Sequence, residues 1–121
     1  MSAPKLTEKQ MTEIAMRADL AGRAAAAATV PTPMYLTDGE SHWKVDDGPC
    51  GFAWIVIRPG TSRFARFARA KLDADTHYYG GVAIWVFQYN QSMTLKEAYA
   101  RAFAEELKTH GIEASAGSRM D

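Results

Sequence analysis

The chain has 121 residues, of which 47% are hydrophobic, 11% aromatic and 23% charged. That length suits one ordinary domain and is too short for two, and the composition is globular rather than disordered. Fourteen Lys and Arg residues balance fourteen Asp and Glu residues, so the formal net charge is zero. This balance argues against an acidic nucleic-acid mimic and against a broadly basic coat for DNA, and it leaves room for a local basic patch.

Cysteine usage and hydropathy restrict the compartment. Cys50 is the single cysteine, so no internal disulfide can form. With no signal peptide, the simplest compartment is a reducing cytosol. The apolar runs, such as residues 24–28 and 52–57, are far shorter than the ~20 residues that span a bilayer. We therefore expect no membrane insertion.

The first predicted element is a helix over residues 7–28. Thr7 with Gln10 three positions later fits a capping box, which supplies partners for unpaired helix N–H groups. The apolar positions recur at helical spacing on one narrow, alanine-rich face: Met11, Ile14, Ala15, Ala18, Ala21 and Ala25. Small side chains allow close approach, either of the rest of the domain or of a second copy of the helix. We therefore divide the chain into an N-terminal packing or oligomerisation arm, residues 1–30, and a core domain, residues 31–121.

Three strands are predicted next, as an antiparallel meander over residues 34–37, 40–45 and 52–57. Asp38-Gly39 suits the positive φ angles of a tight hairpin turn, and residues 46–49 form a second turn. The third strand is a continuous run of apolar, β-branched and aromatic residues. Such a run is typical of a central strand that is covered on both faces.

The rest of the chain alternates helices and strands. We predict a helix over about residues 62–72, a strand over 82–89, a helix that begins at Thr94 in a capping box with Glu97 and ends near His110, and a short strand over 112–115. The predicted fold class is α+β: an N-terminal helix, a three-strand antiparallel meander, then α-β-α-β, in one mixed sheet with helices packed on it. This order resembles ribonuclease-H-like folds, but the two strongest strands lack the carboxylates that hold metal ions in those nucleases.

The clearest candidate site is basic. Five positive charges and no acidic ones occur in residues 58–72: Arg58, Arg63, Arg66, Arg69 and Lys71. At about 100° per residue the three arginines of the helix share one side, and the phenylalanines share the other. Guanidinium groups bind phosphate in a forked geometry, so this stripe could contact a nucleic-acid backbone or a phosphorylated ligand. The alternative is a solvated helix face whose arginines pair with nearby aspartates: Asp38, Asp46, Asp47, Asp73 or Asp75.

Aromatic side chains form a second group of candidates. Tyr78 and Tyr79 precede a Gly-Gly pair and could stack on a base, or could pack their rings and expose their hydroxyls. Trp54 and Trp85 lie within apolar strands, so we expect both in the core. Trp43, beside His42 in the polar meander, is the tryptophan we expect to be exposed.

Other chemistry has weaker signals. Cys50 could be a nucleophile if His42 or His77 came within hydrogen-bond reach, or it could be a small buried hydrophobe. The histidines have no metal-ligand spacing, and no nucleotide-binding or hydrolase motif occurs, so we predict no metal and no cofactor. Gln91-Ser92 and residues 118–121 follow predicted strands, and would meet at one sheet edge if those strands run parallel, or would simply be a helix cap and a frayed terminus.

Several short segments together resemble a group of small, uncharacterised bacteriophage proteins. They are Pro31-Thr-Pro-Met34, Cys50-Gly-Phe-Ala-Trp54, Tyr79-Gly-Gly81, Gln91-Ser92, Lys96-Glu-Ala-Tyr-Ala100, Ala102-Phe-Ala104, Gly111-Ile112 and Ser118-Arg-Met-Asp121. The resemblance covers residues 31–121. It implies a phage or prophage origin and action in a bacterial cytoplasm, and it assigns no catalytic residue.

Three functions remain open on these grounds. The first is a non-catalytic phage accessory protein that binds nucleic acid or a nucleotide through the arginine face, with Tyr78 and Tyr79 as further ligand contacts. The second is a protein–protein interaction module, such as an inhibitor of a host or defence protein or a small virion component, with possible self-association through the N-terminal helix. The third is a Cys50-dependent enzyme.

Overall fold

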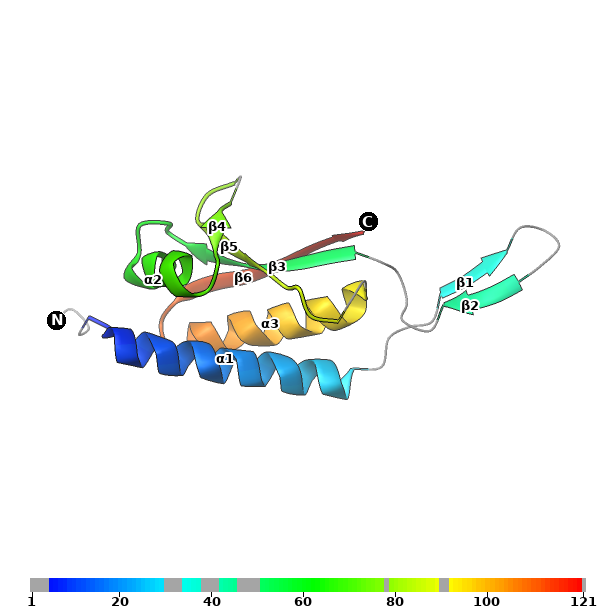
Figure 1. The fold of residues 1–121 in the computed structure, drawn as a ribbon, viewed down its shortest axis with the longest axis horizontal. Helices are drawn as coiled ribbons and strands as arrows, with labels where there is room; N and C mark the ends of the chain where they lie inside the picture. Colours follow the sequence, from blue (N-terminus) through cyan, green and yellow to red (C-terminus); the bar gives the residue numbers. More distant parts are fainter. Residues whose placement is uncertain are drawn as a thin grey trace.

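The computed structural model describes residues 5–29, 34–37, 42–45, 51–77, 79–89 and 92–120, with only the backbone for 34–37 and 42–45 (Figure 1). The helices are α1 (Glu8–Ala28), α2 (Arg63–Lys71) and α3 (Met93–Thr109). The strands are β1 (Met34–Thr37), β2 (His42–Val45), β3 (Gly51–Arg58), β4 (Asp75–Thr76), β5 (Val82–Trp85) and β6 (Glu113–Met120). The predicted α+β class, with the N-terminal helix first and helices packed on a sheet, is confirmed.

The main sheet has four strands in the order β4-β5-β3-β6. Every neighbouring pair of strands is antiparallel. The prediction of a mixed sheet is therefore wrong. β3 is paired along both of its edges. β6 pairs with it from Gly51 to Arg58, and β5 pairs with its other edge from Trp54 to Ile57. The order β3-α2-β4-β5-α3-β6 in this sheet is the ferredoxin-like β-α-β-β-α-β arrangement.

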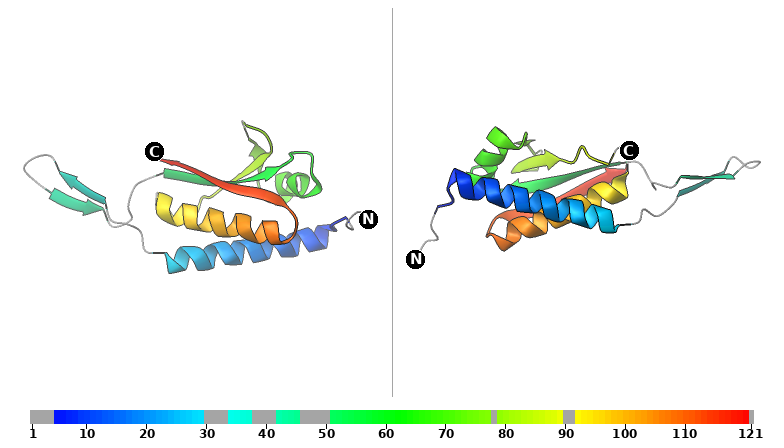
Figure 2. Two further views of the ribbon diagram at one scale, coloured as in Figure 1. Left: turned by 180° about the vertical axis from the view of Figure 1, so that it is seen from behind. Right: turned by 60° about the horizontal axis from the view of Figure 1, so that its bottom comes forward.

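The predicted three-strand meander is wrong. β1 and β2 pair only with each other in a separate two-stranded sheet, and β3 takes its partners from β5 and β6. In both Figures 1 and 2 this hairpin lies beyond one end of the helices and the main sheet. The predicted hairpin turn Asp38-Gly39 lies outside the described residues. Because the meander is missing from the main sheet, the resemblance to the ribonuclease-H-like order does not extend to the topology.

Local boundaries also differ from the predictions. The cap of α3 is Ser92, whose side chain accepts a hydrogen bond from the Leu95 N–H, rather than Thr94. β5 ends at Trp85 instead of continuing to residue 89. β6 runs to Met120, well past the predicted end at residue 115, because eight residues pair with the full length of β3. By contrast, Thr7 and Gln10 form the predicted capping box of α1.

The alanine-rich face of α1 is buried against α3, so the two helices lie side by side on one face of the sheet (Figure 2). Gly22 makes the closest approach. A Cβ at this position would lie 2.6 Å from Cδ2 of the Tyr99 ring on α3. The small residues therefore serve contact within the chain, and α1 contributes Met11, Ile14 and Ala18 to the main hydrophobic core.

The two faces of β3 have different surroundings. Ala53, Ile55 and Ile57 point to the helices and belong to the core. The alternate residues Phe52, Trp54 and Val56 lie on the opposite face, because successive side chains of a strand alternate. Within the described residues no helix lies on that second face, since α1, α2 and α3 all pack into the core on the first. We call it the open face of the sheet.

Replacing Gly22 by Val is expected to destabilise the fold by about 1–3 kcal/mol, because the added atoms overlap the Tyr99 ring. The matched control is Ala24→Val, at an exposed position of the same helix, which should cost about 0.7 kcal/mol or less. Urea unfolding followed by circular dichroism measures both. Equal destabilisation by the two substitutions would contradict the close packing of α1 on α3.

Candidate functional site

The arginine face predicted from the sequence forms as expected. Ser62 caps α2 by accepting a hydrogen bond from the Ala65 N–H at 3.2 Å. The helix then buries Phe64, Ala65, Phe67 and Ala68 in the core. Arg63, Arg66 and Arg69 lie on the other side and are all exposed. The amphipathic spacing alone is sufficient for this result, because the two phenylalanines can reach the core only if the arginines face solvent.

Of the aspartates named as alternative partners of these side chains, the structure describes Asp73 and Asp75, and neither pairs with an arginine of α2. Nε of Arg63 donates to the backbone carbonyl of Leu6, and Nη2 of Arg69 donates to Oγ1 of Thr76 at 2.6 Å. Lys71 is 3.7 Å from the carboxylate of Glu8, with both side chains exposed, so this pair contributes little. Among the described residues none of the three arginines forms an ion pair, and the Arg66 side chain has no hydrogen-bond partner. Asp38, Asp46 and Asp47 lie outside the described residues.

Two adjoining clefts give this surface depth. The first, of about 390 Å³, lies between α1 and α2 and is lined by Glu8, Met11, Arg63, Arg66, Phe67, Ala70 and Lys71. The second, of about 360 Å³, lies at the end of β3 and includes Arg58, Ser62, Arg63 and Glu113. Arg63 lines both clefts. Four cations and two carboxylates therefore border these clefts: Arg58, Arg63, Arg66 and Lys71 with Glu8 and Glu113. We call them, together with the exposed Arg69 on the same side of α2, the α2 cationic surface.

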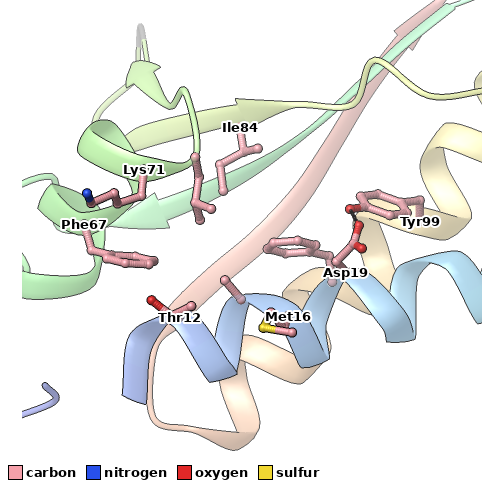
Figure 3. A pocket seen from close by; sticks show the side chains of 10 residues that line it. Thr12, Met16, Asp19, Phe67, Lys71, Ile84 and Tyr99 are labelled. Carbon is pink, nitrogen blue, oxygen red and sulfur yellow. Dashed lines mark hydrogen bonds between the residues drawn. The ribbon is translucent and has the colours of Figure 1, made fainter. Parts of the chain in front are cut away.

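A third cleft, of about 430 Å³, is mostly apolar (Figure 3). It lies between the three helices and Ile84 of β5, and it is bordered by Met16, Phe67 and Phe103. Its carboxylate is already engaged, because Asp19 accepts a hydrogen bond from the Tyr99 hydroxyl and pairs with Arg23 at 2.8 Å. This cleft has space for an apolar group, and Thr12 and Lys71 are the other polar side chains among its lining residues.

The Tyr99 hydroxyl makes the free energy of unfolding depend on pH in the alkaline range. Burial, and secondly the hydrogen bond to Asp19, raise the pKa of Tyr99 well above its ordinary value of about 10. The unfolded chain therefore loses this proton more readily than the folded protein does. The stabilisation from Tyr99 is fully present below pH about 10 and is lost progressively as the pH rises further.

Comparing wild type with Tyr99→Phe isolates this contribution, since the other lysines and tyrosines are common to both proteins. The difference in unfolding free energy is expected to be constant below pH about 10 and then to fall by up to about 1.4 kcal/mol per pH unit. Urea unfolding between pH 8 and about 11 measures it. A difference that stays constant to the highest pH would show that Tyr99 titrates normally.

The predicted core tryptophans are instead on the open face. Trp85 is 37% exposed and Trp54 is half-buried, and neither belongs to the main core. They are directly opposite each other in the β3–β5 register, with ring centroids 5.0 Å apart. Phe52 meets Trp85 edge to face at 6.3 Å. Sequence reasoning missed this cluster because an apolar run does not reveal that one face of its strand is uncovered.

Residues from the turn after β4 extend the same cluster. The His77 ring lies 6.4 Å from Trp54, and the Tyr79 ring lies 6.0 Å from His77. Tyr79 is 78% exposed, and its N–H donates to Nδ1 of His77 at 3.3 Å. Tyr79, chosen from the sequence as a ligand contact, is thus joined to the tryptophans through His77. Tyr78 lies outside the described residues.

Cations border the cluster at the Phe52 end. The Arg119 guanidinium is 5.5 Å from the Phe52 ring centre, and Nζ of Lys96 is 5.7 Å from it. Lys96 is buried and donates to the Gly51 carbonyl at 3.3 Å, which holds its ammonium at the edge of the sheet. Arg119 was expected in a frayed terminus or at a sheet edge. It lies opposite Phe52 in β6.

The other candidates do not form a site that can be described. Cys50 and the side chains of His42 and Trp43 lie outside the described residues, so nothing tests a cysteine nucleophile. In the described part of the chain no group of three or more His, Cys, Asp or Glu residues could hold a metal ion. None of the helices in that part is both long and apolar enough to cross a bilayer.

Fold and site together define a ferredoxin-like α+β domain with an exposed cationic helix and an aromatic cluster on its uncovered sheet face. No protein-family model matches the chain, and neither the curated proteins nor the solved structures include a significant match.

Proposed function

We propose that this protein is non-catalytic and binds a phosphate-bearing partner, nucleic acid or a nucleotide, through the α2 cationic surface. Arg66 is the central contact, Arg63 and Arg69 flank it, and Arg58 and Lys71 support it. The observation that carries the proposal is the absence, among the described residues, of any carboxylate paired with the three exposed arginines of α2.

The arrangement suits phosphate for two reasons. A guanidinium group can donate two parallel hydrogen bonds to phosphate oxygens, and Arg66 has this capacity unused within the described residues. The adjoining clefts let a ligand contact Arg63 from either side while it touches the apolar floor formed by Met11 and Phe67. Because the protein has zero formal net charge, an anionic ligand is attracted to this local patch and not to the protein surface in general.

The proposed setting is that of a phage accessory protein in the host bacterial cytoplasm. Its support is the resemblance of residues 31–121 to small bacteriophage proteins. A cytoplasmic setting is compatible with the finding on membrane-spanning helices given above.

Arg66→Ala tests the proposal with the least risk to folding, because this side chain forms no hydrogen bond or ion pair within the described residues. Loss of one phosphate contact should reduce the slope of log K against log salt by about 0.7 for a single strand or 0.9 for a duplex. Fluorescence anisotropy with labelled oligonucleotides at several salt concentrations measures this slope.

Arg17→Ala is the matched control, because it removes the same charge from an exposed position on a different side of α1. It should leave the slope unchanged. If the triple variant Arg63→Ala, Arg66→Ala, Arg69→Ala bound DNA, RNA and nucleotides as the wild type does, the proposed function would be wrong.

A second function, the protein–protein interaction module, is favoured by one observation on α1. Met16 and Leu20 are 61% and 64% exposed and stand four residues apart, so they form an apolar pair on the helix surface beside the apolar cleft. Exposed apolar pairs of this kind are suited to contact with another protein or with a second copy of the chain.

On this second proposal the wild type self-associates through α1. Light scattering should then give a mass above that of one 13.3 kDa chain, and Met16→Glu with Leu20→Glu should restore the monomer mass. The charge substitutions disrupt apolar contact because buried carboxylates are poorly solvated. A monomeric wild type at high protein concentration would remove self-association and leave only a different protein as the partner.

A further inference from the structure

The open face of the sheet carries an aromatic cluster that the arginine-based function does not use. We propose that this face binds single-stranded nucleic acid by stacking unpaired bases on Trp85 and Trp54. The inference deepens the proposed function by naming the partner, and it rests on that function only for the claim that the partner carries phosphates.

Both tryptophan rings lie on the face away from the helices, where Trp85 is exposed and Trp54 is half-buried. Apolar side chains of a strand normally lie against the core, and Ala53, Ile55 and Ile57 of β3 do so, yet the aromatic side chains of the strand face away from the helices. Val56 is buried on the open face, so the accessible part is the half that bears Phe52, Trp54 and Trp85. Rings held open to solvent on adjacent strands are the feature by which four-stranded sheets stack unpaired bases in other proteins.

The neighbouring strand shapes the platform. Gly117 of β6 lies opposite Trp54, and a Cβ on it would be 2.5 Å from Nε1 of the indole. The Trp54 ring therefore extends across the backbone of β6, in space that any other residue would fill. Trp85 on the other side is 5.0 Å away at an interplanar angle of 47°. Two indoles thus occupy the middle of the open face, with His77 and Phe52 beside them.

The distribution of charge selects the occupant. Arg119 and Lys96 lie within 6 Å of the Phe52 ring centre, and Arg58 is at the other end of the same face. The carboxylates of this face, Asp75 and Glu113, lie opposite Ala83 and Arg58, away from the Phe52–Trp85 end. A ligand that suits this face has flat rings to stack on the aromatic side chains and anionic groups to contact the cations beside them. Single-stranded nucleic acid has that composition, whereas a duplex keeps its base faces covered.

The same strand can continue from the open face to the α2 cationic surface. Arg58 ends β3 on the open face and lines the cleft that it shares with Arg63. Arg63 in turn lines the cleft that contains Arg66. A single strand stacked on the tryptophans can therefore direct its phosphates over Arg58 toward α2, which joins the two surfaces into one path.

The test uses fluorescein-labelled oligonucleotides of about 12 residues, oligo(dT), oligo(U) and a duplex, with the full chain. Both single strands should bind more tightly than the duplex at equal salt, and their ratio distinguishes DNA from RNA as the source. Trp85→Leu should weaken single-strand binding by roughly 5- to 150-fold, the usual effect of losing one stacking ring. Trp85→Phe should restore most of the affinity, because it restores a ring.

Two controls separate stacking from folding. Ala24→Val changes an exposed apolar side chain on α1, outside both proposed surfaces, and should bind like the wild type. In a Trp43→Phe background the remaining fluorescence comes from Trp54 and Trp85, and unlabelled oligo(dT) should quench it. Thermal unfolding of each variant confirms that binding is compared between folded proteins.

Several results would overturn the inference. They are equal loss of affinity in Trp85→Phe and Trp85→Leu, absence of quenching, duplex binding as tight as single-strand binding, or a fall in the mass of a wild-type dimer in Trp85→Leu. The last would show that a second copy covers the open face.

Binding of inorganic polyphosphate separates a failure of the stacking inference from a failure of the proposed function, because polyphosphate has phosphates and no bases. If polyphosphate binding depends on Arg66 while Trp85→Leu changes nothing, only the stacking surface is wrong.

Discussion

The pairing of β3 along both of its edges is the constraint on which the rest of the structure depends. β6 accompanies it over its full length and β5 over half of it, so β3 cannot rotate about its axis. One face is therefore committed to Ala53, Ile55 and Ile57, which pack beneath the helices. The other face is committed to Phe52 and Trp54, and a one-residue slip in register would exchange the two.

Helix α2 is tied to this constraint by its connection to the end of β3. Because Phe64 and Phe67 enter the same core as Ile55 and Ile57, the helix can have only one orientation, with its arginines outward. The open face and the α2 cationic surface thus arise from one packing arrangement, and they meet where Arg58 and Arg63 share a cleft.

Helix α1 is an addition to the β-α-β-β-α-β arrangement. Its small residues let it lie close to α3, and its hydrogen-bonded Asp19–Tyr99 contact spans 80 positions of the chain. Packing against α3 buries most of the alanine-rich face within the chain. Met16 and Leu20 are the large apolar residues of α1 that stay exposed. Any self-association through α1 therefore has to use a different face from the one that its alanine pattern indicated.

Local sequence determined the features that depend on neighbours in the chain. The spacing of Arg63, Arg66 and Arg69 predicted an exposed basic stripe, and Thr7 with Gln10 predicted the start of α1, because both follow from helix geometry alone. The α+β class followed in the same way from the two periodicities of the apolar residues. Only the tertiary structure decided that β1 and β2 leave the main sheet, that its strands are all antiparallel, and that Trp54 and Trp85 lie on the sheet face away from the helices. Strand partners and covered faces depend on contacts between residues far apart in sequence, and a continuous apolar run reads the same whether one face is covered or both.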